Sequence, residues 1–244
     1  MRACALLLLA AFPVSLLSQE QAETREMVGH IGSRSALLVL HATRATDGGW
    51  RLAGEYVLLP TLVRRFLEGE ASPEIGVTTL REGTTPILFG RSPTAELRGS
   101  LRGGSFKGTR YGPGGQERER FEFSEEFPSM ASYSAAVRCE AGDGRYASSL
   151  SYTVDAGTLK SLEWRSKVAP GGHSCTLAGA EQQRPFAGGL RFVSGRCSVT
   201  LRDVGEYVRA SAENCSELCG SQAYLEPLLI DRRGNCRLLR PETR

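Results

Sequence analysis

The sequence predicts an all-β fold of two antiparallel parts: a curved sheet or small barrel, followed by a second, disulfide-stabilised β domain. Two observations predict this class. Short apolar runs alternate with breaks of Gly, Pro, Ser, Thr and charged residues along the 244-residue chain, at the spacing of strands in a meander. Six of the seven cysteines fall between Cys139 and Cys236, so a cysteine-free half precedes a cysteine-rich half.

Residues 1–18 are predicted to be a secretory signal peptide. Arg2 gives a positive start, the stretch from Ala3 to Leu17 is almost entirely apolar, and polar residues follow from Ser18. The apolar stretch is shorter than the roughly 20 residues that span a bilayer, and no later segment reaches that length. We therefore expect a periplasmic or secreted protein without a transmembrane segment, in which Cys4 is removed with the signal peptide.

The first domain is predicted over residues 27–124. The stretch around Pro113 is interpreted as a long hairpin loop, because Phe121 and Phe123 after it alternate as in a strand. The expected strands cover residues 36–40, 50–59, 62–67, 78–81, 96–101, 105–109 and 118–123.

A short repeat of an apolar residue, any residue and a glycine recurs in this domain, ending at Gly54, Gly69, Gly99 and Gly108. The period of a strand places the apolar residue and the glycine on one face. A glycine there marks a bulge, a sharp bend or a close approach of another backbone. Four such bends favour a strongly curved sheet or a small barrel, and the alternative is that the glycines line a ligand groove.

The second domain is predicted over residues 130–244, after a boundary at residues 125–132 where Pro128 interrupts the pattern. Residues 204–206 and 231–235 are interpreted as hairpin turns. The expected strands cover residues 133–139, 146–154, 158–167, 173–177, 190–193, 197–203, 207–211, 223–230 and 236–239.

The six cysteines of this domain predict three disulfides in an exported chain, with 15 possible connectivities. A zinc site is not expected, because Cys215 and Cys219 form a single Cys-x3-Cys pair in an oxidising compartment, and a thioredoxin-like role would need Cys-x2-Cys. Each larger disulfide loop should stabilise the fold by about 3–4 kcal/mol. The spacing favours the bridges Cys215–Cys219, Cys197–Cys236 and Cys139–Cys175.

Charge and motifs argue against several functions. The formal net charge is +3, arginines are dispersed and only three lysines occur, so nucleic-acid binding is not expected. No histidine has metal-ligand spacing, and no nucleophile elbow or phosphate-binding loop occurs, so we expect no catalytic, cofactor or metal site. The residues weighed for such roles are His30, His41, His173, Glu55, Glu82 and Asp155.

Several short motifs in the first domain resemble a module of secreted bacterial proteins that has no assigned activity. The sequence departs from that module at residues 57–60, where an aromatic cluster is usual, and at Arg110, where a Trp is expected. The resemblance implies fold and export rather than an activity. The matching motifs are Gly29-His30-Ile31, Gly54-Glu55-Tyr56, Leu67-Glu68-Gly69, Leu80-Arg81-Glu82 and Phe106-Lys107-Gly108.

Residues 197–201 and 215–223 resemble C-terminal modules of secreted proteobacterial proteins, with a Cys-x-Val strand and a later Cys-Gly-x-x-Ala segment. These modules are distantly similar to periplasmic lysozyme inhibitors. The stretch from Ser194 to Ser198 lacks the Tyr of the inhibitors' Ser-Gly-x-x-Tyr loop. The resemblance therefore does not carry over their inhibitory mechanism.

The favoured function is an exported, non-catalytic binding protein with a protein or cell-envelope ligand, an inhibitor of a lytic enzyme such as lysozyme being one specific form. One alternative is a hydrolase of envelope glycans, in which distant strands bring together a carboxylate pair that includes Glu55 or Glu82. The other is a structural protein of the envelope. The sequence leaves the oligomeric state open.

Overall fold

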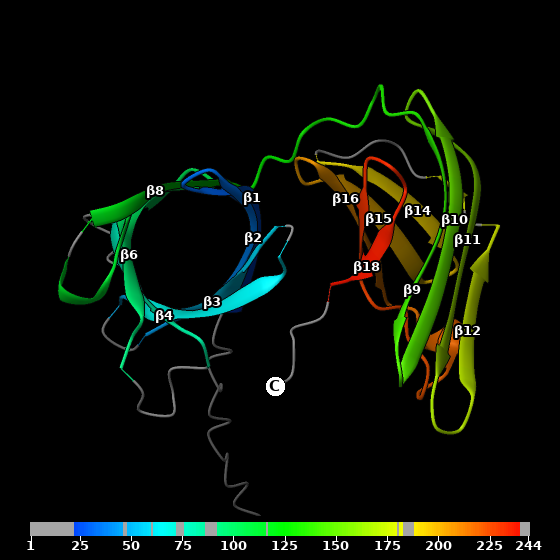
Figure 1. Ribbon diagram of the computed structural model, residues 1–244, viewed down its shortest axis with the longest axis horizontal. Helices are drawn as coiled ribbons and strands as arrows, with labels where there is room; N and C mark the ends of the chain where they lie inside the picture. Colours follow the sequence, from blue (N-terminus) through cyan, green and yellow to red (C-terminus); the bar gives the residue numbers. More distant parts are fainter. Residues whose placement is uncertain are drawn as a thin grey trace, which may run out of the picture.

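The computed structural model describes residues 22–45, 48–59, 61–71, 76–85, 92–115, 117–179, 181–182 and 188–239. The predicted signal peptide, with Cys4, lies outside this part. Eight strands form a closed antiparallel barrel, and a second unit follows it along the chain (Figure 1). No helix within the described residues is long and apolar enough to span a membrane. The all-β prediction is confirmed.

Each barrel strand pairs with the next, and the last strand returns to pair with the first, so the sheet has no free edge. The predicted curved sheet or small barrel is therefore confirmed as a closed barrel. The strands are β1 (Ala22–Ile31), β2 (Arg34–Arg44), β3 (Trp50–Leu58), β4 (Val63–Ala71), β5 (Val77–Gly83), β6 (Ala95–Arg102), β7 (Ser105–Tyr111) and β8 (Glu117–Ser124).

The repeated glycines lie where the backbones of neighbouring strands come closest. A Cβ atom at Gly54 would lie 2.1 Å from the carbonyl oxygen of Val39, and one at Gly108 would lie 2.1 Å from that of Arg98. Gly69 and Gly99 are equally crowded by backbone atoms. Only a residue without a side chain fits at these bends, which supports the structural interpretation of the repeat.

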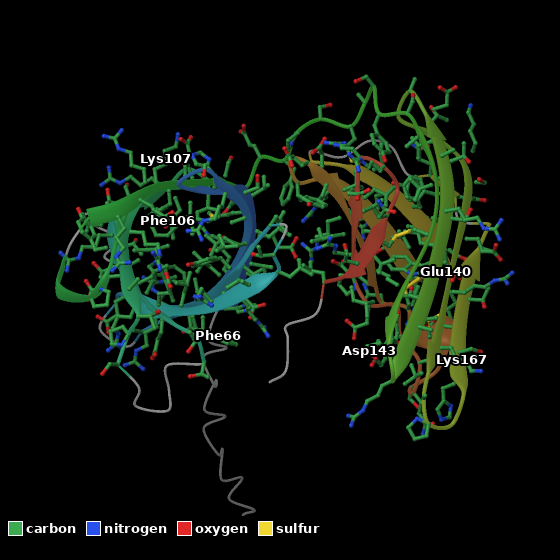
Figure 2. All side chains as sticks on the ribbon, in the orientation of Figure 1. Phe66, Phe106, Lys107, Glu140, Asp143 and Lys167 are labelled. Atoms are coloured by element: carbon green, nitrogen blue, oxygen red, sulfur yellow. A yellow bond between two sulfur atoms is a disulfide. The ribbon has the colours of Figure 1, made fainter. Side chains whose placement is uncertain are left out.

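The interior of the barrel is filled by side chains, as expected for eight strands. Figure 2 shows Phe106 inside the barrel and Lys107 outside it, as the strand period requires. The rings of Phe106 and Phe121 lie 4.6 Å apart. This core forms without a cysteine. Its largest apolar members are Met27, Ile31, Leu38, Leu40, Leu52, Tyr56, Leu67, Leu80, Leu97, Phe106, Phe121 and Phe123.

The second unit is a sandwich of a four-stranded and a six-stranded antiparallel sheet. The strands of the smaller sheet are β9 (Ala135–Asp143), β10 (Tyr146–Asp155), β11 (Thr158–Val168) and β12 (His173–Ala178). Those of the larger sheet are β13 (Glu181–Gln182), β14 (Leu190–Ser194), β15 (Cys197–Asp203), β16 (Tyr207–Glu213), β17 (Leu228–Asp231) and β18 (Cys236–Leu238), with the short helix α1 (Ser216–Cys219) after β16.

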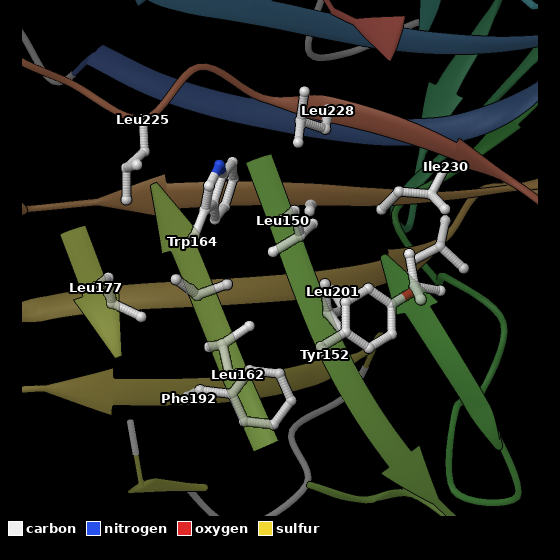
Figure 3. Packing of buried hydrophobic residues seen from close by; sticks show 14 of the residues in the cluster. Leu150, Tyr152, Leu162, Trp164, Leu177, Phe192, Leu201, Leu225, Leu228 and Ile230 are labelled. Carbon is white, nitrogen blue, oxygen red and sulfur yellow. The ribbon is translucent and has the colours of Figure 1, made fainter. Parts of the chain in front are cut away.

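Apolar side chains from both sheets fill the space between them. Trp164 and Leu150 of the smaller sheet and Phe192 of the larger sheet lie in this layer (Figure 3). All three side chains are almost fully buried. The predicted strand over residues 223–230 is shorter than expected, because only its end belongs to β17.

Three disulfides form as predicted, but all three predicted pairings are wrong. The bridges are Cys139–Cys236, Cys175–Cys219 and Cys197–Cys215, with Cα–Cα distances of 5.6, 4.5 and 4.2 Å. The physical reason is strand register, which chain spacing does not report. For example, β15 and β16 pair Ser198 with Glu213, so Cys197 lies beside the segment that follows β16.

The barrel and the sandwich meet through a small apolar interface. Leu37 and Leu59 of the barrel pack with Val204 and Leu229 of the sandwich, and all four side chains are buried. Polar contacts add to it, because Glu26 on β1 forms ion pairs with Arg202 and Arg209. These contacts fix one face of β1 and β2 against the sandwich.

Candidate functional site

Glu82 is the most deeply buried charged side chain of the barrel, and it lies at one end of the interior. Its carboxylate accepts two hydrogen bonds from Arg110, from Nε at 2.7 Å and from Nη2 at 2.8 Å. The Tyr56 hydroxyl donates a third at 2.8 Å, and the Thr94 hydroxyl a fourth at 3.3 Å. Both carboxylate oxygens therefore already accept hydrogen bonds from neighbouring side chains.

This environment fixes the protonation state of the group. Burial opposes ionisation of Glu82, but the hydrogen bonds and charge of Arg110, with Tyr56 and Arg65, hold its pKa below the usual value. Burial and the neighbouring carboxylate raise the pKa of Tyr56. Glu82 is thus an anion and Tyr56 a neutral phenol near pH 7, whereas a general acid needs a raised carboxyl pKa.

The ionic contacts continue across the same end of the barrel. Arg110 also contacts Glu119 at 3.4 Å, and Nη2 of Arg34 donates to both oxygens of Glu119 at 2.8 Å. Arg65 lies 3.5 Å from Glu82. The cluster joins strands that are far apart in sequence and closes this end of the barrel, which is a structural role.

The structure does not bring the predicted carboxylates together. Glu55 points outward from β3, where it forms an ion pair with Arg64. Its neighbour Tyr56 points inward to Glu82, so Glu55 and Glu82 lie on opposite faces of the barrel wall. Asp155 belongs to the sandwich, at the end of β10.

The three histidines are spread over the molecule. His30 and His41 lie on the outer face of the barrel, and Nδ1 of His41 is 3.0 Å from the Thr24 hydroxyl. His173 begins β12 in the sandwich. Within the described residues, no group of His, Cys, Asp and Glu side chains could hold a metal ion. The six predicted cysteines all take part in disulfides.

An open groove of about 1310 Å³ crosses the outer face of the barrel over β2 to β6. Two rows of outward side chains line it, as the strand register shows. Val77 at its margin is 55% exposed. The rows are His41, Ala53, Glu68, Arg81 and Glu96, and next to it Thr43, Arg51, Glu70 and Thr79. We call this the barrel groove.

Opposite charges face each other in the barrel groove without pairing. Arg51 lies across from Glu70, and Arg81 across from Glu68. None of these four side chains forms an ion pair within the described part of the chain. On other parts of the barrel wall comparable charges do pair, as Lys107 does with Glu122 at 2.5 Å.

Sequence reasoning did not single out the barrel groove. Its charged residues come from four strands and look like ordinary solvated positions in the chain. A row of charges becomes visible only once the cross-strand register is known, and the alternation of outward charges with inward leucines was the available signal.

Comparisons with known proteins identify no relative of this chain. No family model matches the chain, and neither a curated protein nor a solved structure matches it. The two resemblances described from the sequence therefore gain no support from these comparisons.

Proposed function

We propose that this chain is an exported, non-catalytic binding protein that takes a protein ligand in the barrel groove. The observation that carries the proposal is a set of four charges held in register on the barrel wall, which form no ion pair with any residue that the structure describes: Arg51, Glu68, Glu70 and Arg81. Such charges can pair with a partner without first breaking contacts in the free protein. Electrostatic complementarity of this kind gives specificity and fast association.

A protein ligand fits the barrel groove better than a small molecule does. Small-molecule sites are mostly apolar and enclose their ligand. The barrel groove is open, alternates acidic and basic groups, and carries the exposed Val77 at its margin. An inhibitor of a lytic enzyme such as lysozyme is one specific form of this function.

The disulfides support export of the chain. Three cysteine pairs at bridging distance indicate an oxidising, exported environment. The periplasm is the proposed location, with a protein of the bacterial envelope as the ligand.

The test uses purified full-length mature protein and a purified muramidase, with binding measured by calorimetry and inhibition by turnover. The double variant Arg51→Gln/Arg81→Gln should weaken binding by about tenfold, which is about 1.4 kcal/mol. The matched control is Arg120→Gln, since Arg120 is exposed on β8, outside the barrel groove.

Retention of binding by the control and its loss in the double variant would support the proposal. Equal losses in both variants would place the binding site elsewhere. Absence of binding and inhibition with muramidases would remove the inhibitor form, and the same two variants would then be tested against envelope proteins.

A further inference from the structure

The outer face of the sandwich's smaller sheet has a trough that follows β10. Outward positions in the first half of this central strand carry small side chains, Ala147 and Ser149. Longer charged side chains stand on the two neighbouring strands, Glu140 on β9 and Arg165 and Lys167 on β11. An open hollow of about 580 Å³ lies here, lined by these residues. We call it the β10 trough.

The register fixes the dimensions of the β10 trough. Ser149 pairs with Glu140 on one side and with Arg165 on the other. Two strand spacings therefore separate the walls, which is about 10 Å. That width admits one extended chain. Along β11, Arg165 and Lys167 are two residues apart, so their spacing is about 6.8 Å.

The floor of the β10 trough is held in place from the inside of the sandwich. The indole nitrogen of Trp164 donates to the Ser148 hydroxyl at 2.9 Å, and the Ser166 hydroxyl donates to the Tyr224 carbonyl at 2.6 Å. The Cys175–Cys219 bridge ties the next strand, β12, to α1. A ligand would therefore meet a surface that is already ordered, which reduces the entropy lost on binding.

Several polar groups of the β10 trough are not committed to other residues. Lys167 and Glu140 form no ion pair, and the Ser149 hydroxyl forms no hydrogen bond, among the residues that the structure describes. Arg165 pairs with Glu163 through Nη2, and its other nitrogens leave further donors. Asp143 at the end of the trough already accepts two backbone hydrogen bonds, from Arg145 and Tyr146.

We propose that the β10 trough binds an extended peptide with acidic side chains on alternate residues. An extended peptide repeats every 6.8 Å or so on each side, which matches the spacing of Arg165 and Lys167. Alternate carboxylates would pair with these two cations, and the Ser149 hydroxyl of the floor would bond to the peptide backbone. On the opposite wall, Glu140 disfavours acidic residues at the intervening positions.

This site lies on a different unit from the barrel groove, so it goes beyond the proposed function. The test titrates blocked pentapeptides into the full mature protein by calorimetry at low salt. One peptide alternates glutamate with serine, the second alternates lysine with serine, and the third contains only glutamate. The proposal expects the first to bind best, the third more weakly and the second not at all.

Two variants locate the site. Lys167→Gln should weaken binding of the alternating acidic peptide by about tenfold, because one of the two matching cations is lost. Ser149→Phe should abolish binding by filling the floor. Lys160→Gln is the matched control, since Lys160 is exposed on the same strand but does not line the trough. Binding should also fall as salt rises.

Equal binding of the lysine peptide, or an equal loss in the Lys160 variant, would overturn the proposal. So would binding of a linear chitin oligosaccharide in place of every peptide, since that would assign the trough to a glycan. The Arg51→Gln/Arg81→Gln variant should bind the acidic peptide normally, which separates this site from the barrel groove.

Discussion

The barrel and the sandwich are both antiparallel, but they deal with exposed sheet edges in different ways. The barrel closes on itself by pairing β8 with β1, so it has no edge strand and contains no cysteine. The smaller sheet of the sandwich has two edges, β9 and β12, and each is joined by a disulfide to the other layer or to α1. Two of the three disulfides therefore tie down the edge strands of this sheet.

The two units also differ in how they use polar groups inside. The barrel holds a charged cluster around Glu82, whereas the buried polar side chains of the sandwich, among the residues that the structure describes, are neutral hydroxyls such as Ser148. An internal ion cluster is sensitive to pH and to loss of a single member. A disulfide is sensitive to reductants. Variants in each unit can therefore test the comparison separately.

The largest expected effect concerns the disulfides. Cys139–Cys236 spans 97 residues and Cys197–Cys215 spans 18. Restriction of the unfolded chain predicts losses of about 4.7 and about 3 kcal/mol when each pair is changed to alanine. Urea unfolding of the two double variants would measure both values. A larger loss for the shorter loop would contradict a chain-entropy origin of the stability.

The next effect concerns the barrel cluster. Glu82→Ala leaves Arg110 without its main partner in a largely buried position, and should cost about 3–5 kcal/mol. The matched control is Glu122→Ala, which removes an exposed ion pair with Lys107 and should change stability far less, because solvent screens that pair. Thermal unfolding monitored by circular dichroism would compare them, and equal shifts would show that the cluster is not structurally important.

A smaller effect on stability is expected when a glycine in each unit is replaced by alanine. Gly108→Ala in the barrel forces a Cβ to within 2.1 Å of the Arg98 carbonyl oxygen, and should cost about 1–3 kcal/mol. Gly144→Ala, in the hairpin between β9 and β10, meets nothing within 4 Å and should change stability by about 0.5 kcal/mol or less. Similar denaturation midpoints for the two variants would refute the close-approach explanation.

The smallest effect is the pH dependence that Glu82 contributes to the stability of the barrel. The folded-state pKa of Glu82 lies below its ordinary value of 4.5, so its contribution to stability is present above pH 4.5. That contribution is lost as the pH falls through the folded-state pKa. Unfolding midpoints measured from pH 7 downward should decline more steeply in the parent than in Glu82→Gln. Parallel declines would show that other groups dominate.

Much of the fold could be predicted from the sequence, because strand positions and bends depend on local patterns. Glycines such as Gly54 and Gly108, which recur in the apolar-x-Gly repeat, correctly predict the curvature of the barrel. The prediction missed β1 altogether, because the expected strands begin at residue 36. Residues 22–27 pair with β2 alone and are mostly polar, so no apolar pattern marks them as a strand. Glu26 there is explained only by its partners in the sandwich, Arg202 and Arg209.

The sites and the disulfide partners depend on register between distant segments, which no local pattern reports. In the sequence, nothing distinguishes Glu55 from Glu82 as a candidate catalytic carboxylate. In the structure, the two side chains lie on opposite faces of the barrel wall. Glu55 forms an ion pair with Arg64, and Glu82 forms an ion pair with Arg110. In the same way, only cross-strand pairing brings the four charges of the barrel groove together.

The most direct test of the contrast between the two units uses the two tryptophans, Trp50 in the barrel and Trp164 in the sandwich. Fluorescence of the variants Trp50→Phe and Trp164→Phe would follow urea unfolding with and without a reductant. The account predicts that the reductant lowers the midpoint reported by Trp164 and changes that of Trp50 much less. An equal fall in both midpoints would contradict a barrel that is stable through its own core.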